Sequence, residues 1–419
     1  MNAQLISTGA ELVIGQTVDT NSAWLSRRLA ELGIRVKLHA TVADEIEPIR
    51  QQLEQACVWA DLVLVSGGLG PTADDLTRDA LAALLGVTLA RREEYVEQIR
   101  AFFTARGRVM PESNVVQAMF PAGSEPITNT CGTAPGIRAR LGRAMIFIMP
   151  GVPREMQVMY DHDVLPALAP LAGEGVILAS TIYCYGAGES DIGERIRDLM
   201  ARDRNPTVGT TAQQTVIGVR IHAYGRTRAE AQALLDKDRA EVRERLGILV
   251  FGENDDRLAA AVGSLLTRHG QTISTAESCT GGLLAGRLTD IPGSSAYFLQ
   301  GVVTYSNAAK AKMLDVPIDL IAHHGAVSRE VAEAMAVSCR HISGTDFAVS
   351  ITGIAGPDGG TPEKPVGLVY IGLADATGCD VTEHRLGETL TRDEIRDRTT
   401  KVALNRVRLR LAKLAAVGK

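Results

Sequence analysis

The stretch Thr275–Gly282 (TAESCTGG) constrains the fold of this chain more than any other segment. An apolar run precedes it and a helix-like run follows it, which predicts a strand, a tight turn and the start of a helix. The first amide N–H groups of a helix lack partners, and Gly281 and Gly282 let the backbone approach a ligand closely. The turn can therefore hold an anion and present the hydroxyl of Ser278 or the thiol of Cys279 to it.

Short apolar runs alternate with helix-like segments along much of the chain. Residues 61–66 (DLVLVS) are an example, because a short and almost wholly apolar run is typical of a strand that is covered on both faces. Such alternation predicts an α/β fold with a mostly parallel sheet. The length of 419 residues and the 45% of hydrophobic residues suffice for two or three packed domains. We expect an α/β domain with a mostly parallel sheet over residues 1–170, a small α+β domain over residues 171–252 and a second α/β domain over residues 253–419.

Composition and charge exclude several classes of protein. The net charge is -5 and no block of lysine or arginine stands out, so direct binding of nucleic acid is not expected. No apolar run approaches the roughly 20 residues that span a membrane, and the first residues lack the pattern of a signal peptide, which together predict a cytoplasmic protein. The 6 cysteines are scattered without a C-x-x-C pair, so we expect free thiols.

A glycine-rich loop follows the apolar run at residues 61–66, at the carboxyl end of a predicted strand, where open α/β sheets bind ligands. Amide groups of glycines can bind anions, and the aspartates of this loop can accept from hydroxyl groups or hold a divalent cation. A second turn-rich loop at residues 129–136 is expected to form another wall of the same site. The candidate residues of this N-terminal site are Gly67, Gly68, Gly70, Asp74, Asp75, Thr77, Asn129 and Gly132.

Five short motifs follow one another in the C-terminal part of the chain. They are AESCTGG (276–282), GSS (293–295), VTYSNAAK (303–310), HGAVS (324–328) and TGIAGPDGG (352–360). Together they resemble the CinA C-terminal domain. The known activity of that domain is the deamidation of nicotinamide mononucleotide to nicotinate mononucleotide and ammonia.

Three N-terminal motifs extend the resemblance to the rest of the chain. They are GGLGPTADDLT (67–77), NTCGTAPG (129–136) and MPGVPREM (149–156). They resemble the matching domain of full-length CinA proteins, which is similar to the molybdopterin-binding domains of molybdenum cofactor enzymes. In some CinA relatives this domain is a metal-dependent ADP-ribose pyrophosphatase.

The resemblance implies that Ser278 is the nucleophile and Lys310 its base, with Tyr305 and Ser295 assisting and without a cofactor. A lysine can take a proton from serine only if burial or nearby positive charge lowers its pKa. We therefore expect the amine of Lys310 to meet the hydroxyl of Ser278 among the glycine-rich loops. The residues alone leave Cys279 open as a rival nucleophile, because a thiolate at a helix start is activated.

Substrate binding is assigned to the glycine-rich loops and to the start of the last helix. The pair Arg392 and Arg396 lies one helical turn apart and suits a monophosphate, although solvated helix arginines are an equal alternative. Glu277 either orients a base or a ribose hydroxyl, or caps a helix. The expected substrate-binding residues are Glu277, Gly281, Gly282, Thr352, Gly353, Ala355, Gly356, Arg392 and Arg396.

The sequence thus predicts a bifunctional pyridine-nucleotide enzyme. The C-terminal domain is expected to deamidate nicotinamide mononucleotide. The N-terminal domain is expected to hydrolyse ADP-ribose with a divalent metal such as Mg²⁺, with or without K⁺, held by Asp74 and Asp75. By resemblance, a homodimer is also expected. Two alternatives stay open: a non-catalytic binding protein linked to competence and DNA damage, and a pterin-binding module.

Overall fold

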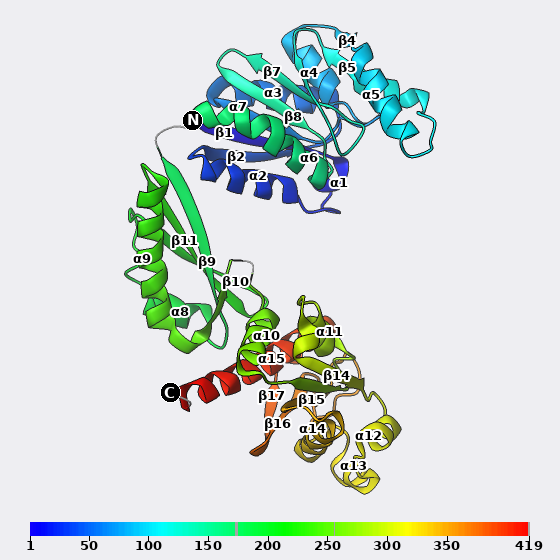
Figure 1. Cartoon of the computed structure of the whole chain (residues 1–419), viewed down its shortest axis with the longest axis vertical. Coiled ribbons are helices and arrows are strands. Elements are labelled where there is room, and N and C mark those ends of the chain that lie inside the picture. The colour runs from blue at the N-terminus through cyan, green and yellow to red at the C-terminus, as the bar shows by residue number, and fades with distance from the viewer. Residues whose placement is uncertain (172–174, 255, 418–419) are drawn as a thin grey trace. The chain divides into compact units, whose positions relative to one another are not determined.

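The computed structural model describes residues 1–171, 175–254 and 256–417, with side chains described to residue 414. The chain divides into two compact units. Figure 1 labels the helices and strands and colours the chain from blue at the N-terminus to red at the C-terminus. The first unit comprises Met1–Leu178 and His222–Leu235, and the second comprises Ala179–Ile221 and Asp236–Lys419. The expected boundary at residues 170 and 171 adjoins residues 172–174, which lie outside the described residues.

A six-stranded sheet forms the centre of the first unit. Its strand order is β2 (Arg35–Val42), β1 (Asn2–Thr8), β3 (Leu62–Ser66), β8 (Ala144–Met149), β7 (Gly136–Leu141) and β6 (Glu125–Ile127). The first four strands are parallel to one another, and β7 and β6 continue the sheet in antiparallel pairing. A small sheet of β4 (Leu89–Arg91) and β5 (Met119–Pro121) stands apart. The predicted α/β class with a mostly parallel sheet is confirmed.

Helices cover both faces of this sheet, which explains the apolar run in β3. Leu62 and Leu64 pack into one core with residues of α2 and α6, whereas Val63 and Val65 pack into another with residues of α3 and α4. Side chains alternate between the faces of a strand, so a strand covered on both sides needs apolar residues throughout. The helices are α1 (Ala10–Val13), α2 (Thr20–Glu31), α3 (Ile46–Trp59), α4 (Thr77–Leu85), α5 (Glu93–Thr104), α6 (Pro153–Met159) and α7 (Leu165–Leu168).

The middle of the chain forms a four-stranded sheet with helices, as expected for a small α+β segment. The strand order is β10 (Thr207–Gln213), β11 (Val216–Gly225), β9 (Val176–Cys184) and β12 (Val250–Glu253). The helices are α8 (Glu189–Arg195) and α9 (Arg228–Leu246), followed by the 3₁₀ turn η4 (Gly247–Leu249).

A five-stranded sheet organises the C-terminal part of the second unit. Its order is β14 (Phe298–Val303), β13 (Ile273–Glu277), β15 (Phe347–Gly353), β16 (Leu368–Asp375) and β17 (Gly378–Arg385). The first three strands are parallel, and the last two are added in antiparallel pairing. The helices are α10 (Leu258–His269), α11 (Leu283–Thr289), α12 (Asn307–Leu314), α13 (Ile318–His324), α14 (Arg329–Ser343) and α15 (Arg392–Val417).

The two faces of this sheet carry different cores. Residues of α14, among them Val331 and Met335, pack on one face, and residues of α10, α11 and α15 pack on the other. All the cysteines are free thiols, as predicted. Within the part of the chain that the structure describes, no helix combines the length and the apolar character that a membrane span requires.

Candidate active site

Ser278 directly follows β13, at the carboxyl edge of the C-terminal sheet. Its amide N–H donates to the carbonyl of Ile351 on β15 at 2.9 Å, so the serine extends the strand ladder by one residue. The chain then turns, because the amide of Gly281 donates to the carbonyl of Ser278 at 3.0 Å. Gly281 and Gly282 have φ angles of 60° and 91°, a backbone region that favours glycine. The glycine pair is therefore required by the turn itself.

Lys310 reaches the same point from α12. This helix begins after Ser306, whose hydroxyl accepts from the amide of Ala309 at 3.1 Å. The amine Nζ of Lys310 donates to Oγ of Ser278 at 2.9 Å and to the carbonyl of Thr304 at 2.8 Å. The expected meeting of this hydroxyl and this amine is confirmed.

Burial prepares the lysine to act as a base. Lys310 is 1% exposed and Ser278 is 9% exposed. Burial lowers the pKa of the Lys310 amine from its ordinary value of 10.5, because the charged form loses its hydration. No carboxylate forms an ion pair with this amine in the described part of the chain to hold the proton on it. The neutral amine can therefore accept a proton from Ser278.

Cys279 is poorly suited to act as the rival nucleophile. Its side chain is 6% exposed and packs in the apolar core with Leu284 and Ile351. Burial raises the pKa of the Cys279 thiol to about 12, so the reactive thiolate is scarce at neutral pH. The geometry favours Ser278.

Glu277 caps a helix, which corrects its assignment to substrate binding. Its side chain is 0% exposed. One carboxylate oxygen accepts from the amides of Gly282 and Leu284 at 3.1 and 3.0 Å, and the other accepts from the amide of Ala285 at 2.8 Å. These are the first amides of α11, which have no partner within the helix. The carboxylate thus holds the Ser278 turn against the helix start and is not available to a ligand.

The two residues expected to assist catalysis lie in different places. Tyr305 follows Thr304 at the edge of the sheet where Ser278 lies, and its hydroxyl accepts from Nη2 of Arg392 at 2.6 Å. Ser295 precedes β14, whose first residue, Phe298, pairs with the first residue of β13. A five-residue strand spans about 13 Å, so Ser295 and Ser278 lie at opposite ends of β13. The structure therefore does not bring Ser295 to Ser278 within one chain, and the expected assistance by Ser295 stays a prediction.

The expected arginine pair contacts the loops beside Ser278. Nη1 of Arg392 donates to the carbonyl of Gly356 at 2.8 Å, and Nη2 of Arg396 donates to the carbonyl of Thr280 at 2.9 Å. A Cβ atom at Gly281 would lie 3.7 Å from Nη2 of Arg396. The start of α15 therefore places both guanidinium groups around the turn that carries Ser278.

The end of β15 and the start of the loop after it hold residues that the fold itself uses, contrary to their expected role in substrate binding. The hydroxyl of Thr352 donates to the carbonyl of Ala326 at 2.7 Å, so it is not free to bind a phosphate. A Cβ at Gly353 would lie 2.7 Å from the carbonyl of Leu368, which makes glycine necessary for strand pairing. Ala355 is 4% exposed and packs in the core. Among the described residues 352–356, Gly356 is the one whose carbonyl accepts a hydrogen bond from the arginine pair.

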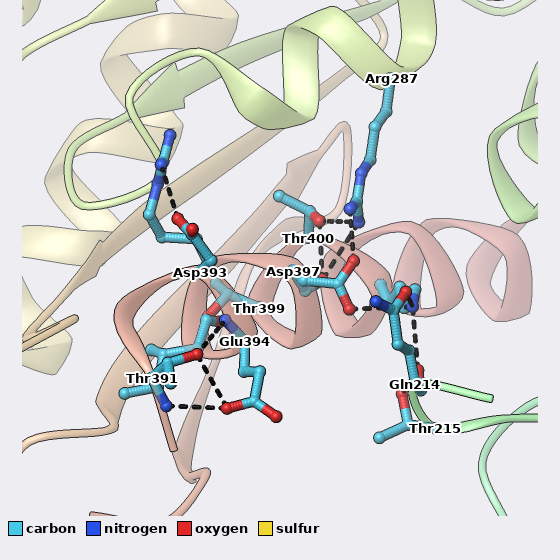
Figure 2. A network of polar contacts seen from close by, with 12 residues as sticks. Gln214, Thr215, Arg287, Thr391, Asp393, Glu394, Asp397, Thr399 and Thr400 are labelled. Atoms are coloured by element: carbon cyan, nitrogen blue, oxygen red, sulfur yellow. Dashed lines mark hydrogen bonds and ion pairs between the residues drawn. The ribbon is translucent and has the colours of Figure 1, made fainter. Parts of the chain in front are cut away.

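Sequence reasoning missed the contacts that tie α11 to α15. Figure 2 shows Arg287 of α11 pointing to Asp397 and Thr400 of α15. The guanidinium donates to the side chain of Asp397 at 2.5 Å, and Lys401 donates to the other oxygen of that carboxylate at 2.9 Å. This network fixes the helix that follows the Ser278 turn relative to the helix that carries the arginine pair. No sequence motif predicts this network, because Arg287 and Asp397 are 110 residues apart in the chain.

The N-terminal loop needs glycine because it packs tightly on its neighbours. A Cβ at Gly67 would lie 2.5 Å from the carbonyl of Thr8, and one at Gly68 would overlap the hydroxyl of Thr77. Thr77 is 0% exposed and its hydroxyl lies 3.3 Å from that of Thr8. These residues close the loop onto β1.

The expected pair of metal ligands does not present two free carboxylates. Asp75 accepts from the amides of Gly70 and Thr72 at 2.7 and 2.9 Å, so it shapes the loop. Asp74 is exposed, and a hydrogen bond from Thr72 lowers the pKa of its carboxyl group. Among the described residues, no group of three or more His, Cys, Asp or Glu side chains is arranged to hold a metal ion. The residues present therefore do not fit a preformed metal site.

Asn129 organises the second N-terminal loop. Its side-chain oxygen accepts from the amides of Cys131 and Gly132 at 2.9 and 2.8 Å. Its side-chain nitrogen donates to a carboxylate oxygen of Glu155 at 2.6 Å. A Cβ at Gly132 would overlap that carboxylate, so glycine is required there. Both residues shape the loop.

Comparisons with known proteins agree with this architecture. Three family models match in order: a probable molybdopterin binding domain at residues 4–170, a damage-inducible protein CinA KH domain at residues 179–252 and the CinA C-terminal domain at residues 255–411. The crystal structure of the competence/damage inducible protein CihA from Agrobacterium tumefaciens is 46% identical and covers 37% of this chain and 93% of that chain, with a TM-score of 0.35.

Relatives also match along nearly the whole chain. A relative from Moorella thermoacetica is 45% identical over 89% of this chain and 90% of its own length. A CinA-like protein from Dictyoglomus thermophilum is 42% identical over 99% of this chain and 100% of its own length. This chain therefore belongs to the CinA family.

Proposed function

We propose that the C-terminal domain hydrolyses the carboxamide of nicotinamide mononucleotide to give nicotinate mononucleotide and ammonia. The observation that carries this proposal is the 2.9 Å contact between the buried amine of Lys310 and the hydroxyl of Ser278. A hydrolase that attacks an amide without a metal needs a nucleophile, a base and donors for the oxyanion. The motif resemblance supplies the substrate, and the contact supports the chemistry.

Lys310 acts as the base in this mechanism. Its neutral amine accepts the proton of Ser278 as Oγ attacks the carboxamide carbon. The C–N bond then breaks, the Lys310 ammonium returns the proton to the leaving nitrogen, and ammonia departs. Water then attacks the carbonyl carbon of the resulting ester while Lys310 accepts its proton. The bond from that carbon to Oγ breaks, the Lys310 ammonium returns the proton to Oγ of Ser278, and the acid is released. The carbonyl of Thr304 holds the amine in place throughout.

Two backbone amides are suited to hold the oxyanion. The N–H groups of Cys279 and Thr280 donate to no other residue in the described part of the chain, and that of Cys279 lies beside its own thiol. Both lie within the turn that the bond from Gly281 to Ser278 closes. Successive unpaired amides in such a turn form a concave site for an anion. They are therefore the proposed donors to the carbonyl oxygen that becomes charged during attack.

The arginine pair accounts for recognition of the mononucleotide phosphate. Arg392 and Arg396 carry fixed positive charges, and they donate to the carbonyls of Gly356 and of Thr280 in the Ser278 turn. Guanidinium groups bind phosphate oxygens with paired hydrogen bonds. No cofactor takes part in the proposed deamidation. We also propose that the protein is located in the cytoplasm and forms a homodimer.

A second proposal concerns the N-terminal domain, which we propose acts on ADP-ribose with a divalent cation. Burial raises the pKa of the Asp44 carboxyl group, and the nearby carboxylates of Glu11, Asp74 and Asp75 raise it further. This concentration of negative charge beside the glycine-rich loop favours a cation. No reaction step is derived through the metal, because the described residues form no preformed ligand set.

The test is product analysis with the full-length protein. Incubation with nicotinamide mononucleotide is expected to yield equal amounts of ammonia and nicotinate mononucleotide, with or without a chelator. Incubation with ADP-ribose is expected to yield AMP and ribose phosphate only when a divalent cation is present. The absence of ammonia release by wild-type protein favours a non-catalytic or pterin-binding role and contradicts the first proposal.

A further inference from the structure

A long loop connects β15 to β16. The amide of Gly367 donates to the carbonyl of Ile354 at 2.8 Å, which closes the base of this loop. The residues between them, 355–366, are called the β15–β16 loop here, and their middle part, 357–363, is exposed. An exposed segment with few buried contacts opens easily unless other contacts hold it.

Lys364 provides such contacts for the β15–β16 loop. Its amine Nζ donates to the carbonyls of His324 and Val327 at 2.7 and 2.8 Å. In the described part of the chain, no other residue of the segment 357–366 forms a hydrogen bond or an ion pair with a residue outside 354–368. The amine of Lys364 therefore joins the exposed part of the loop to the rest of the domain.

The segment of residues 324–327, between α13 and α14, is a fixed support for this amine. The carbonyl of Ala326 accepts from the hydroxyl of Thr352 at 2.7 Å, and the carbonyl of Gly325 accepts from the hydroxyl of Ser328 at 2.9 Å. The other two carbonyls of the segment are those that the amine contacts, so all four have a donor. A lysine amine suits this role, because it has three N–H groups and can donate to two carbonyls at once.

The start of the same loop contacts an arginine of the proposed phosphate site. The carbonyl of Gly356 accepts from Nη1 of Arg392 at 2.8 Å, and Nη2 of Arg392 donates to the hydroxyl of Tyr305 at 2.6 Å. A Cβ atom at Gly356 would lie 2.7 Å from Cγ1 of Val366, so the two ends of the loop pack directly on each other. Val366 is the second residue after Lys364, and a shift of the loop at Lys364 therefore also shifts Gly356 and its contact with Arg392.

We propose that Lys364 is a positioning residue for recognition of the substrate phosphate, an inference that rests on the proposed deamidation. Its amine holds the β15–β16 loop on the support, and the loop holds the guanidinium group of Arg392 through the carbonyl of Gly356. The amine forms no hydrogen bond with Ser278 or Lys310 in the described part of the chain. Its loss is therefore expected to weaken substrate binding and to leave the chemical step almost unchanged.

Steady-state kinetics of ammonia release from nicotinamide mononucleotide by the full-length protein test this role. Lys364→Met keeps an unbranched side chain and removes the donors. We expect KM to rise about tenfold, with kcat within about threefold of the wild-type value. Lys364→Arg, which keeps a charged donor, is expected to bring KM back to within about threefold of wild type. Glu363→Gln, at the exposed neighbouring position, is the matched control and is expected to leave KM unchanged.

A double-mutant cycle shows whether Lys364 acts through Arg392. If it does, Lys364→Met has no further effect once Arg392→Ala has removed the guanidinium group. The double variant is then expected to have the KM of Arg392→Ala alone. A merely structural role of Lys364 predicts instead that the two increases in KM multiply.

Two results overturn the inference when wild-type protein releases ammonia. The first is a wild-type KM in Lys364→Met, and the second is a double variant in which the two increases in KM multiply. Absence of ammonia release by wild-type protein contradicts the proposed function, and the positioning role fails with it. If Lys364→Met unfolds at a lower temperature than wild-type protein, Lys364→Gln, with a shorter and uncharged donor, is measured in its place and the same two results decide.

Discussion

The amine of Lys310 lies 2.9 Å from the hydroxyl of Ser278, although 32 residues separate them in the chain. Ser278 follows β13 and Lys310 lies on the helix that follows β14. Because β13 and β14 are parallel neighbours, both connections start from the same edge of the sheet. The contact is a consequence of strand order. Burial then lowers the pKa of Lys310, which favours the neutral amine that can accept a proton.

Replacement of the lysine tests its role as a base. Lys310→Met keeps an unbranched side chain in the buried position and removes the proton acceptor. Deamidation is expected to fall by about 10²–10⁴-fold, the usual contribution of a general base, as measured by ammonia release. Lys312→Met is the matched control, because Lys312 lies on the same helix with an exposed side chain. Turnover that persists in Lys310→Met contradicts the mechanism.

The pH dependence follows from the burial of the same lysine. The base must be neutral, and burial lowers the pKa of Lys310 below 10.5. As the pH falls through that pKa, Lys310 becomes protonated and kcat/KM for nicotinamide mononucleotide decreases. As the pH rises above it, the rate reaches a plateau. A profile of kcat/KM is expected to show this limb centred below 10.5, and a limb centred at or above 10.5 disagrees with a buried base.

The cysteine beside the nucleophile is expected to be dispensable. Cys279 is buried and the pKa of its thiol is raised to about 12, so it contributes little thiolate at pH 7. Cys279→Ala removes the sulfur and leaves the backbone amide of residue 279 in place. Steady-state assays are expected to show deamidation within about tenfold of the wild-type rate, because the change acts only through packing. Loss of turnover in a variant that unfolds at the wild-type temperature points instead to a cysteine nucleophile.

The capping carboxylate of Glu277 is expected to matter for stability. Glu277→Gln places an amide group where three backbone amides need an acceptor. The free energy of unfolding, measured by urea titration, is expected to fall by about 1–3 kcal/mol. Glu363→Gln, in an exposed loop, serves as the control and is expected to leave stability unchanged. Equal stability of Glu277→Gln and wild-type protein rules out the capping role.

Much of the architecture follows from local sequence. The apolar residues of β3 reflect a strand with helices on both faces, and the turn at Gly281 and Gly282 reflects backbone angles that favour glycine. These features depend on a few consecutive residues and their immediate surroundings, so a sequence pattern can predict them. The meeting of Ser278 and Lys310 needed the resemblance as well, because spacing along a chain does not give distance in space.

The differences between the predicted and the observed roles of site residues have a common physical origin. Ser295 is 17 positions from Ser278, but the intervening helix returns the chain to the opposite end of the sheet. Thr304 binds Lys310 through its carbonyl, a group that every residue has and that leaves no sequence signal. The sequence pattern predicts the carboxylates of Glu277 and Asp75 as ligand groups, whereas in the fold they accept hydrogen bonds from nearby amides and stabilise turns. Which polar groups are already satisfied becomes known only from the folded structure.

The most direct test of the central claim is ammonia release from nicotinamide mononucleotide by Ser278→Ala, measured beside wild-type protein at equal concentration. The change deletes the hydroxyl that accepts from Lys310 and leaves the backbone turn intact. We predict ammonia release by wild-type protein and none above background by the variant, with equal unfolding temperatures. Ammonia release that survives the substitution contradicts a serine nucleophile at position 278.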